Sequence, residues 1–206
     1  MYLYKIIPIN NKLSRVQENK VIHEEAFRLL EQNLIEKFHF KKEDLKYKYG
    51  LRGKPYLETS PLCFSISHCN NIIVCIISER NVGIDIEEVK KINRFIVSKA
   101  LTQKEQEELK KVQAELLDKK NEYFFRLWTL KEALMKTIGD GLSYGIKNIE
   151  FNISRDILFC NNNLLKQDKK DILCNLKGFI FKQEKLCVDD KEYIVSISME
   201  DSNDEY

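Results

Sequence analysis

Three observations predict an α+β protein. Short apolar segments rich in β-branched residues alternate with segments whose apolar positions recur at helical spacing. The order of these segments is strand–helix–strands, followed by strand–helices–strands. Of the 206 residues, 43% are apolar, which is ample for a packed core and argues against a disordered chain. The repeated order points to two related α+β halves, the first over residues 1–81 and the second over residues 82–206.

The first half begins with a strand and a long helix. Residues 2–9 have an extended pattern, and apolar residues that recur every three or four positions predict a helix over about residues 18–38. Residues 49–57 hold two glycines and a proline, and therefore predict a turn followed by an extended piece. Residues 62–78 predict two strands joined at the turn signal Asn70-Asn71.

The second half begins with a strand from residue 82, VGIDIE, whose β-branched side chains favour an extended backbone. Helical spacing then predicts three helices, over residues 92–100, 103–117 and 121–138. Thr102 and Glu105 fit a capping box for the middle helix, because threonine can satisfy an orphan N–H and glutamate can reach back. Alternating apolar and polar residues predict strands in the segments IEFNI, LKGFIF and EYIVSIS.

Composition limits the class of protein. A net charge of +2 with 32% charged residues argues against a nucleic-acid binder that relies on a broad basic surface. The longest apolar run, IIVCII, is too short to cross a membrane, and the first ten residues lack the apolar stretch of a signal peptide. The six cysteines lack zinc-site spacing, so we expect reduced core residues rather than a disulfide framework. These features predict a cytoplasmic protein.

Two acidic residues of the VGIDIE segment need a positive partner. Asp85 and Glu87 lie two positions apart, so in a strand their side chains point to the same face, opposite Ile84 and Ile86. Like charges at that spacing raise each other's pKa unless a cation lies between them. A lysine on the helix of residues 121–138 is also unusual. Lys131 falls inside the apolar arc, where its ammonium must either snorkel to water or meet an anion.

Each candidate residue has an ordinary structural interpretation when it is considered alone. Asp85 and Glu87 could form a solvated strand face, and Glu132 with Lys136 could form an i,i+4 pair on a helix surface. Together with His68 and the nearby lysines, however, three carboxylates suit a site where a divalent cation meets phosphate. Oxygen ligands favour magnesium, which commonly binds one or two carboxylates together with substrate phosphate.

The order of five motifs resembles one known family. G-K-P, F-S-I-S-H, V-G-I-D-I-E, L-T-Q-K-E-Q-E-E-L and W-T-L-K-E-A-L-M-K occur in turn over residues 45–145. This order resembles the 4′-phosphopantetheinyl transferase superfamily, and Asp-x-Glu in place of a lone Asp resembles its surfactin-synthetase-activating (Sfp-like) branch. The resemblance implies an α+β pseudodimer in a single chain, with the active site in the cleft between the halves. A monomer follows, because no second subunit would be needed to complete the site.

The resemblance also implies a role for each motif residue. The expected magnesium ligands are Asp85, Glu87 and Glu132. The expected coenzyme A-binding residues are Lys54, Ser67, His68, Lys131 and Lys136, with His68 at the 3′-phosphate and Lys136 at the diphosphate. The expected catalytic residues are Glu132, Lys136 and Glu105, where Glu105 matches a proposed general base. Basic residues that normally precede the first large helix are replaced here, at best, by Arg15, Lys20, His23 and Arg28.

The activity that the resemblance implies is magnesium-dependent transfer of 4′-phosphopantetheine from coenzyme A to a serine of an apo carrier protein. The carrier could serve fatty-acid, polyketide or nonribosomal peptide synthesis. Two other functions remain as alternatives, a non-catalytic module that binds carrier proteins and a magnesium-dependent phosphohydrolase. Carrier proteins of this system are small and acidic, so an apolar surface with a cationic rim should receive them. The candidates are Lys90, Lys91, Arg94 and Lys99 around Phe95 and Ile96.

Overall fold

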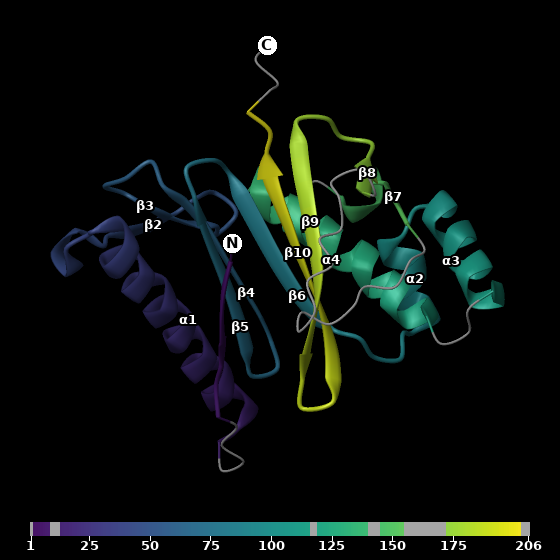
Figure 1. Ribbon diagram of the computed structural model, residues 1–206, viewed down its shortest axis with the longest axis horizontal. Helices are drawn as coiled ribbons and strands as arrows, with labels where there is room; N and C mark the ends of the chain where they lie inside the picture. The colour runs from purple at the N-terminus through teal and green to yellow at the C-terminus, as the bar shows by residue number, and fades with distance from the viewer. Residues whose placement is uncertain (1, 9–12, 116–118, 140–144, 155–171, 203–206) are drawn as a thin grey trace.

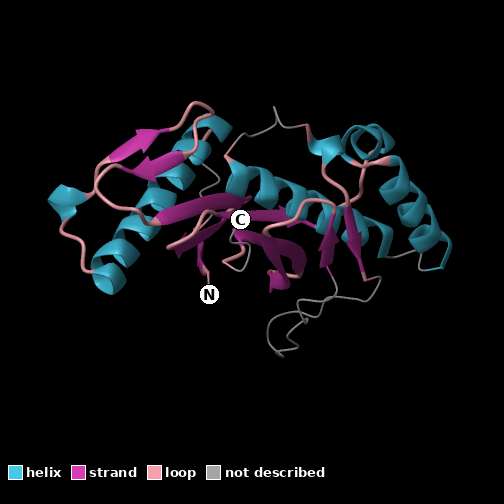
Figure 2. Ribbon diagram, turned by 90° about the horizontal axis from the view of Figure 1, so that it is seen from above, coloured by secondary structure: helices cyan, strands magenta, loops and turns pink. Residues whose placement is uncertain are grey.

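Two three-stranded antiparallel sheets form the centre of the protein, with helices to either side (Figures 1 and 2). The computed structural model describes residues 2–8, 13–115, 119–139, 145–154 and 172–202. The first half contains β1 (Leu3–Ile6), α1 (Arg15–Phe38), β2 (Tyr47–Tyr49), β3 (Pro55–Leu57), β4 (Cys63–Cys69) and β5 (Ile72–Ser78). The second half contains β6 (Val82–Glu88), α2 (Arg94–Ala100), α3 (Gln103–Glu115), α4 (Lys120–Ile138), β7 (Phe151–Ile153), β8 (Ile172–Cys174), β9 (Phe179–Val188) and β10 (Lys191–Glu200). The mixture of helices and small sheets confirms the α+β class that the sequence predicts.

The two halves share one topology. The strand order is β1-β5-β4 in the first sheet and β6-β10-β9 in the second. In each sheet the last strand in sequence is therefore central, between the first strand on one side and the next-to-last strand on the other. All of these pairings are antiparallel. Each half also carries a long helix after its first strand and a small two-stranded sheet, β2-β3 or β7-β8. The expected division after residue 81 falls in the link between β5 and β6.

Three apolar clusters hold these layers together. The helix α1 covers one face of the first sheet through Ala26, Leu29, Leu30 and Leu34, and α4 forms the main cluster of the second half, which includes Ile194 of β10. Apolar residues from both sheets form the cluster between them, including Ile72 and Val74 of β5 and Ile84 and Ile86 of β6. Alternate residues of β6 therefore face opposite ways, with Ile84 and Ile86 inward and Asp85 and Glu87 on the other face.

The strands β4 and β6 lie side by side where the two sheets meet (Figure 1). Side-chain hydrogen bonds join Ser67 to Asp85, Cys69 to Glu87 and Asn70 to Glu88. The separation along the chain is 18 residues in every case. A constant separation means that the two strands run parallel, with these side chains in register. The sheets thus meet at a seam of polar contacts, and each half contributes one side of it.

The helix α4 packs very closely against β6 at Gly83. A Cβ atom at this position would lie 1.9 Å from the carbonyl oxygen of Ala133 and 2.7 Å from the backbone nitrogen of Thr137. Only glycine lets the helix backbone approach the strand this closely. Because Asp85 follows on the same face of β6, this contact also determines how near α4 comes to the carboxylates.

Some sequence expectations are corrected. The helix α1 starts at Arg15, earlier than expected, because Ser14 and Gln17 form a capping box. The extended piece after Gly53 pairs with residues 47–49 as a hairpin. Cys63, Cys69, Cys75 and Cys174 are free thiols as expected. The exposed Cys187 is disulfide-bonded, which overturns its assignment as a reduced core residue, and Cys160 lies outside the described residues. No described helix is long and apolar enough to cross a membrane.

Candidate active site

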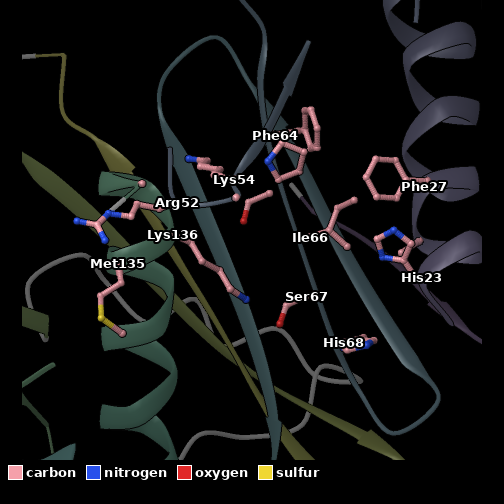
Figure 3. A pocket seen from close by; sticks show the side chains of 15 residues that line it. His23, Phe27, Arg52, Lys54, Phe64, Ile66, Ser67, His68, Met135 and Lys136 are labelled. Atoms are coloured by element: carbon pink, nitrogen blue, oxygen red, sulfur yellow. The ribbon is translucent and has the colours of Figure 1, made fainter. Parts of the chain in front are cut away.

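A cavity of about 350 Å³ opens beside the seam, between α1, the turn after β2, β4 and the C-terminal end of α4 (Figure 3). Its volume falls in the range of small-molecule sites. Apolar side chains such as Phe27, Phe64 and Ile66 form much of the wall. The cavity also holds a concentration of basic side chains, which are His23, Arg52, Lys54, His68 and Lys136. A basic pocket with an apolar wall suits a ligand that carries phosphate groups and an aromatic base.

Asp85 contacts two residues that line this cavity, Ser67 and Lys136, and is the centre of a charged cluster. Its Oδ1 accepts hydrogen bonds from Lys136 Nζ at 2.8 Å and from Ser67 Oγ at 2.8 Å, so β4, β6 and α4 meet here. Lys136 Nζ also donates to the carbonyl oxygen of Ile84 at 3.0 Å. The other carboxylate oxygen, Oδ2, is buried and has no hydrogen-bond partner in the part of the chain described. An unpartnered buried carboxylate oxygen calls for a cation or a donor that the protein itself does not supply.

Glu87 and Glu132 add two further carboxylates to this cluster. Burial and the charge of Asp85 raise the pKa of Glu87, and the same two causes raise the pKa of Glu132 to about 7. Lys136 lowers both pKa values and Lys90 lowers that of Glu87 further, but burial and the neighbouring carboxylates outweigh them. No set of three His, Cys, Asp or Glu side chains in the described ranges is already gathered closely enough to hold a metal ion. The donor chemistry nevertheless suits a divalent cation, because all three side chains offer carboxylate oxygens and Asp85 Oδ2 lacks a partner among the described residues.

His68 and Lys54 border the cavity from the first half. Loss of solvent around the imidazole of His68, followed by the charge of Lys136, lowers its pKa. Lys54 Nζ lies 3.2 Å from the carbonyl oxygen of Val82 and 3.4 Å from that of Thr137, so it also ties the hairpin to the C-terminal end of α4. Burial lowers the pKa of Lys54.

Glu105 and Lys131 are paired in the interior. Lys131 Nζ lies 2.5 Å from Glu105 Oε2, and the exposed fractions of the two side chains are 0% and 1%. Neither residue lines the cavity. The expected capping box is also present, since Thr102 and Glu105 exchange backbone-to-side-chain hydrogen bonds of 2.8 and 3.2 Å. Lys131 thus meets an anion, which is one of the two outcomes that its place on the apolar arc predicts.

The helix α2 presents an exposed surface of mixed character. Phe95 is 62% and Ile96 44% exposed, so neither is a core residue. Lys90, Lys91, Arg94 and Lys99 are exposed around them, and Lys99 Nζ lies 4.2 Å from the centre of the Phe95 ring. This surface is apolar with a cationic rim, as the sequence predicts for the residues that follow β6.

The structure adds one basic cavity residue that the sequence analysis did not name. Arg52 lies in the turn after β2 and lines the cavity together with Lys54. The sequence feature that could have identified Arg52 is its position between the turn glycines Gly50 and Gly53, two residues before Lys54. His23 of α1, named only as a substitute for the usual basic residues, also lines the cavity. Arg15 lines a second cavity, of about 670 Å³, which also contacts His68.

A family profile described as the 4′-phosphopantetheinyl transferase superfamily matches residues 81–197. The chain belongs to this superfamily. Residues 81–197 hold the Asp85, Glu87, Glu132 and Lys136 cluster, while the cavity residues of α1 and β4 precede the match. The match therefore covers the acidic side of the site.

Individual members of the superfamily are similar over about half of the chain. The 4′-phosphopantetheinyl transferase psf-1 of Bacillus pumilus is 34% identical over 115 residues, 55% of this chain and 48% of its own length. The transferase gsp of Aneurinibacillus migulanus is 30% identical over 145 residues, 69% of this chain and 57% of its own. The transferase Sfp of Bacillus subtilis (strain 168) is 29% identical over 120 residues, 58% of this chain and 52% of its own. The chain thus spans about half the length of the relatives it matches, and these Bacillus-type members agree with the expected branch.

Proposed function

We propose that this superfamily member transfers 4′-phosphopantetheine from coenzyme A to a serine hydroxyl of an apo carrier protein and releases adenosine 3′,5′-bisphosphate. The observation that supports this most directly is Asp85, which has a buried and unpartnered Oδ2 and contacts Ser67 and Lys136 of a basic cavity of small-molecule size. The names of the relatives point to the same reaction class.

Magnesium would be held by Asp85, Glu87 and Glu132, which supply the hard oxygen ligands that this ion prefers. When bound, the ion would neutralise charge on the diphosphate of coenzyme A. The remaining positive charge comes from the chain. Lys136 Nζ already touches Asp85 and lines the cavity, so it can contact the diphosphate and stabilise the leaving phosphate. Positioning of this kind does most of the work in phosphoryl transfer.

The cavity would bind the nucleotide end of coenzyme A. Ser67 and Lys54 lie where phosphate oxygens would enter, and His68 would contact the 3′-phosphate. We add His23 and Arg52 to this group, because both line the same cavity. Both contribute positive or potentially positive charge, which an anionic ligand requires.

A carboxylate must accept the proton of the attacking serine. The resemblance leaves two candidates, Glu105 or one of the three proposed metal ligands acting through a water molecule. Glu105 is enclosed and lies away from the cavity. We therefore assign the step to the group of Asp85, Glu87 and Glu132.

The proposed architecture is a pseudodimer of the halves 1–81 and 82–206 with the site in the cleft between them. The repeated strand order and the seam of β4 and β6 support it. The proposal includes a cytoplasmic monomer, because both sides of the cavity come from one chain. The surface of α2 would receive the acidic carrier.

The proposal is tested by incubating the protein with Mg²⁺, coenzyme A and a panel of apo carrier proteins of the three classes. A carrier should gain the mass of one phosphopantetheine arm, and EDTA or Asp85→Asn should remove that gain. Binding of a carrier without any mass change would favour the non-catalytic module. Release of inorganic phosphate without carrier would favour a phosphohydrolase. Either result would overturn the proposal.

A further inference from the structure

We infer that Glu105 and Lys131 are positioning residues whose buried ion pair fixes the placement of α4, so that Glu132 and Lys136 reach Asp85. The inference rests on the proposed function, because the site that they would position is the proposed one. It gives Glu105 a different role from the general base that the resemblance implies.

The ammonium of Lys131 is fully used inside the protein. Besides Glu105, Lys131 Nζ donates to the carbonyl oxygen of Ala100 at 3.0 Å and to that of Ile146 at 3.3 Å. Ala100 is the last residue of α2, and Ile146 precedes β7. One ammonium on α4 therefore holds three separate segments of the second half.

Glu105 caps its own helix and joins one more segment to the same point. Its Oε2 accepts from the backbone N–H of Thr102 at 2.8 Å, and its Oε1 accepts from the backbone N–H of Phe151 at 2.9 Å. The start of α3 and the start of β7 are thereby joined to Lys131. Three of the four acceptor positions of the Glu105 carboxylate are thereby occupied inside the protein, and Glu105 does not line the cavity where the substrate would bind.

The position of Lys131 on α4 explains why the pair matters for the site. Lys131 directly precedes Glu132 in the chain, and Lys136 follows little more than one turn later. On the opposite side, Gly83 lets the backbone of α4 touch β6. The ion pair and the glycine contact thus fix the position of α4 from two sides. A shift of α4 by a fraction of a turn would carry Glu132 and Lys136 away from Asp85.

Buried ion pairs differ from apolar contacts in a way that suits this role. A saturated pair has few alternative arrangements, whereas removal of one partner leaves a charge buried without compensation. Replacement of both charges together is therefore expected to disturb the protein less than replacement of one. If Glu105 were a general base, its replacement would lower kcat, and replacing Lys131 as well would not restore kcat.

The test measures Mn²⁺ binding by electron paramagnetic resonance, together with KM and kcat for transfer. Mn²⁺ serves as a probe because it accepts the same oxygen ligands. The variants are Glu105→Gln, Lys131→Met and the double variant. We expect each single variant to weaken Mn²⁺ binding by about 10- to 100-fold, as for other residues that orient metal ligands. The double variant should recover part of this loss.

A matched control exists on the same helix. Glu122 of α4 pairs with Lys185 at 2.8 Å, and their side chains are 9% and 4% exposed. Glu122 lies ten positions before Glu132. Glu122→Gln with Lys185→Met should lower the midpoint of thermal unfolding but leave Mn²⁺ affinity unchanged. This separates positioning from a general loss of stability.

Three outcomes would overturn the inference. The first is that Glu105→Gln binds Mn²⁺ and coenzyme A normally but loses kcat, which would identify Glu105 as the base. The second is that the double variant binds Mn²⁺ no better than Lys131→Met. The third is that the control pair weakens Mn²⁺ binding equally. If Lys131→Met does not fold, Glu105→Gln and Glu105→Asp carry the test. Failure of the wild-type protein to bind Mn²⁺ or to transfer the arm would instead reject the proposed function, and this inference with it.

Discussion

At the scale of single residues, Lys136 shows that a local sequence pattern predicts the face of a helix on which a residue lies but not the distant residue that it contacts. The sequence predicts a lysine beside Glu132 on one helix and two carboxylates on one strand. In the folded chain, Lys136 contacts Asp85, from which it is separated by 51 residues. Periodicity gives the face of each element but not which faces meet, so the two clues could be joined only through the family resemblance. The unusual position of Lys131 could be recognised from the sequence alone, because a lysine on the apolar arc is anomalous within its own helix.

The first prediction concerns His68. His68→Ala should raise KM for coenzyme A roughly 10-fold and leave kcat nearly unchanged, because a phosphate contact is made equally in the ground and transition states. Dephospho-coenzyme A lacks the 3′-phosphate, so its KM should be insensitive to the substitution. An equal loss with both substrates would exclude the 3′-phosphate role.

The second prediction concerns the pH dependence of coenzyme A binding. The pKa of His68 is lowered in the free protein, and a bound phosphate dianion would raise it. Binding then takes up a proton, so affinity should be highest below the pKa of the free protein and fall as pH rises through that of the complex. Calorimetry in buffers of different ionisation enthalpy measures this uptake. His68→Ala should remove most of it, with His23→Ala as the comparison because His23 lines the same cavity.

At the scale of elements, periodicity predicted most helices and strands, but boundaries and pairings needed the fold. The capping box of Thr102 and Glu105 was readable because both signals lie within four residues. The pairing of β2 with β3 was not, since three-residue strands carry too little pattern. The parallel seam of β4 and β6 was also hidden, because it uses side chains rather than a backbone ladder.

The third prediction concerns Gly83. Gly83→Ala should push α4 away from β6, since the new Cβ would overlap a helix carbonyl. We expect a loss of about 1–3 kcal/mol in the free energy of unfolding, and weaker Mn²⁺ binding because Glu132 moves away from Asp85. Urea denaturation and metal titration measure the two effects. Gly50→Ala is the control, because its Cβ would meet only an ordinary contact at 3.6 Å. Equal behaviour of the two variants would show that the close approach is unimportant.

At the scale of the whole molecule, charge is arranged in local groups. A net charge of +2 provides little long-range attraction, yet basic residues gather at the cavity and around Phe95 and Ile96 on α2. Composition excluded a broad basic surface, but the grouping depends on how distant segments fold together. The two groups suit two anionic partners, a nucleotide in the cavity and an acidic protein on α2.

The fourth prediction concerns this second surface. Lys91→Glu with Arg94→Glu should slow association with an acidic carrier roughly tenfold at low ionic strength and flatten its salt dependence. Affinity for coenzyme A should not change, because neither residue lines the cavity. Stopped-flow association rates provide the measurement. Lys41→Glu with Lys42→Glu makes the same charge change on exposed residues of the first half. If that pair slows capture as much, only total charge matters and the docking surface lies elsewhere.

The seam between β4 and β6 also bears on the order in which the chain folds. Its contacts join residues only 18 positions apart, whereas Lys136 must return across 51 positions to reach Asp85. Contacts between distant residues cost more loop-closure entropy and form more slowly. We therefore expect Asp85 and Glu87 to come together beside β4 while the ammonium that offsets their repulsion is still absent. A divalent ion present at that moment would supply the missing positive charge. Refolding should therefore be faster in Mg²⁺ than in EDTA. The proposed cofactor would then assist folding before it takes part in the reaction.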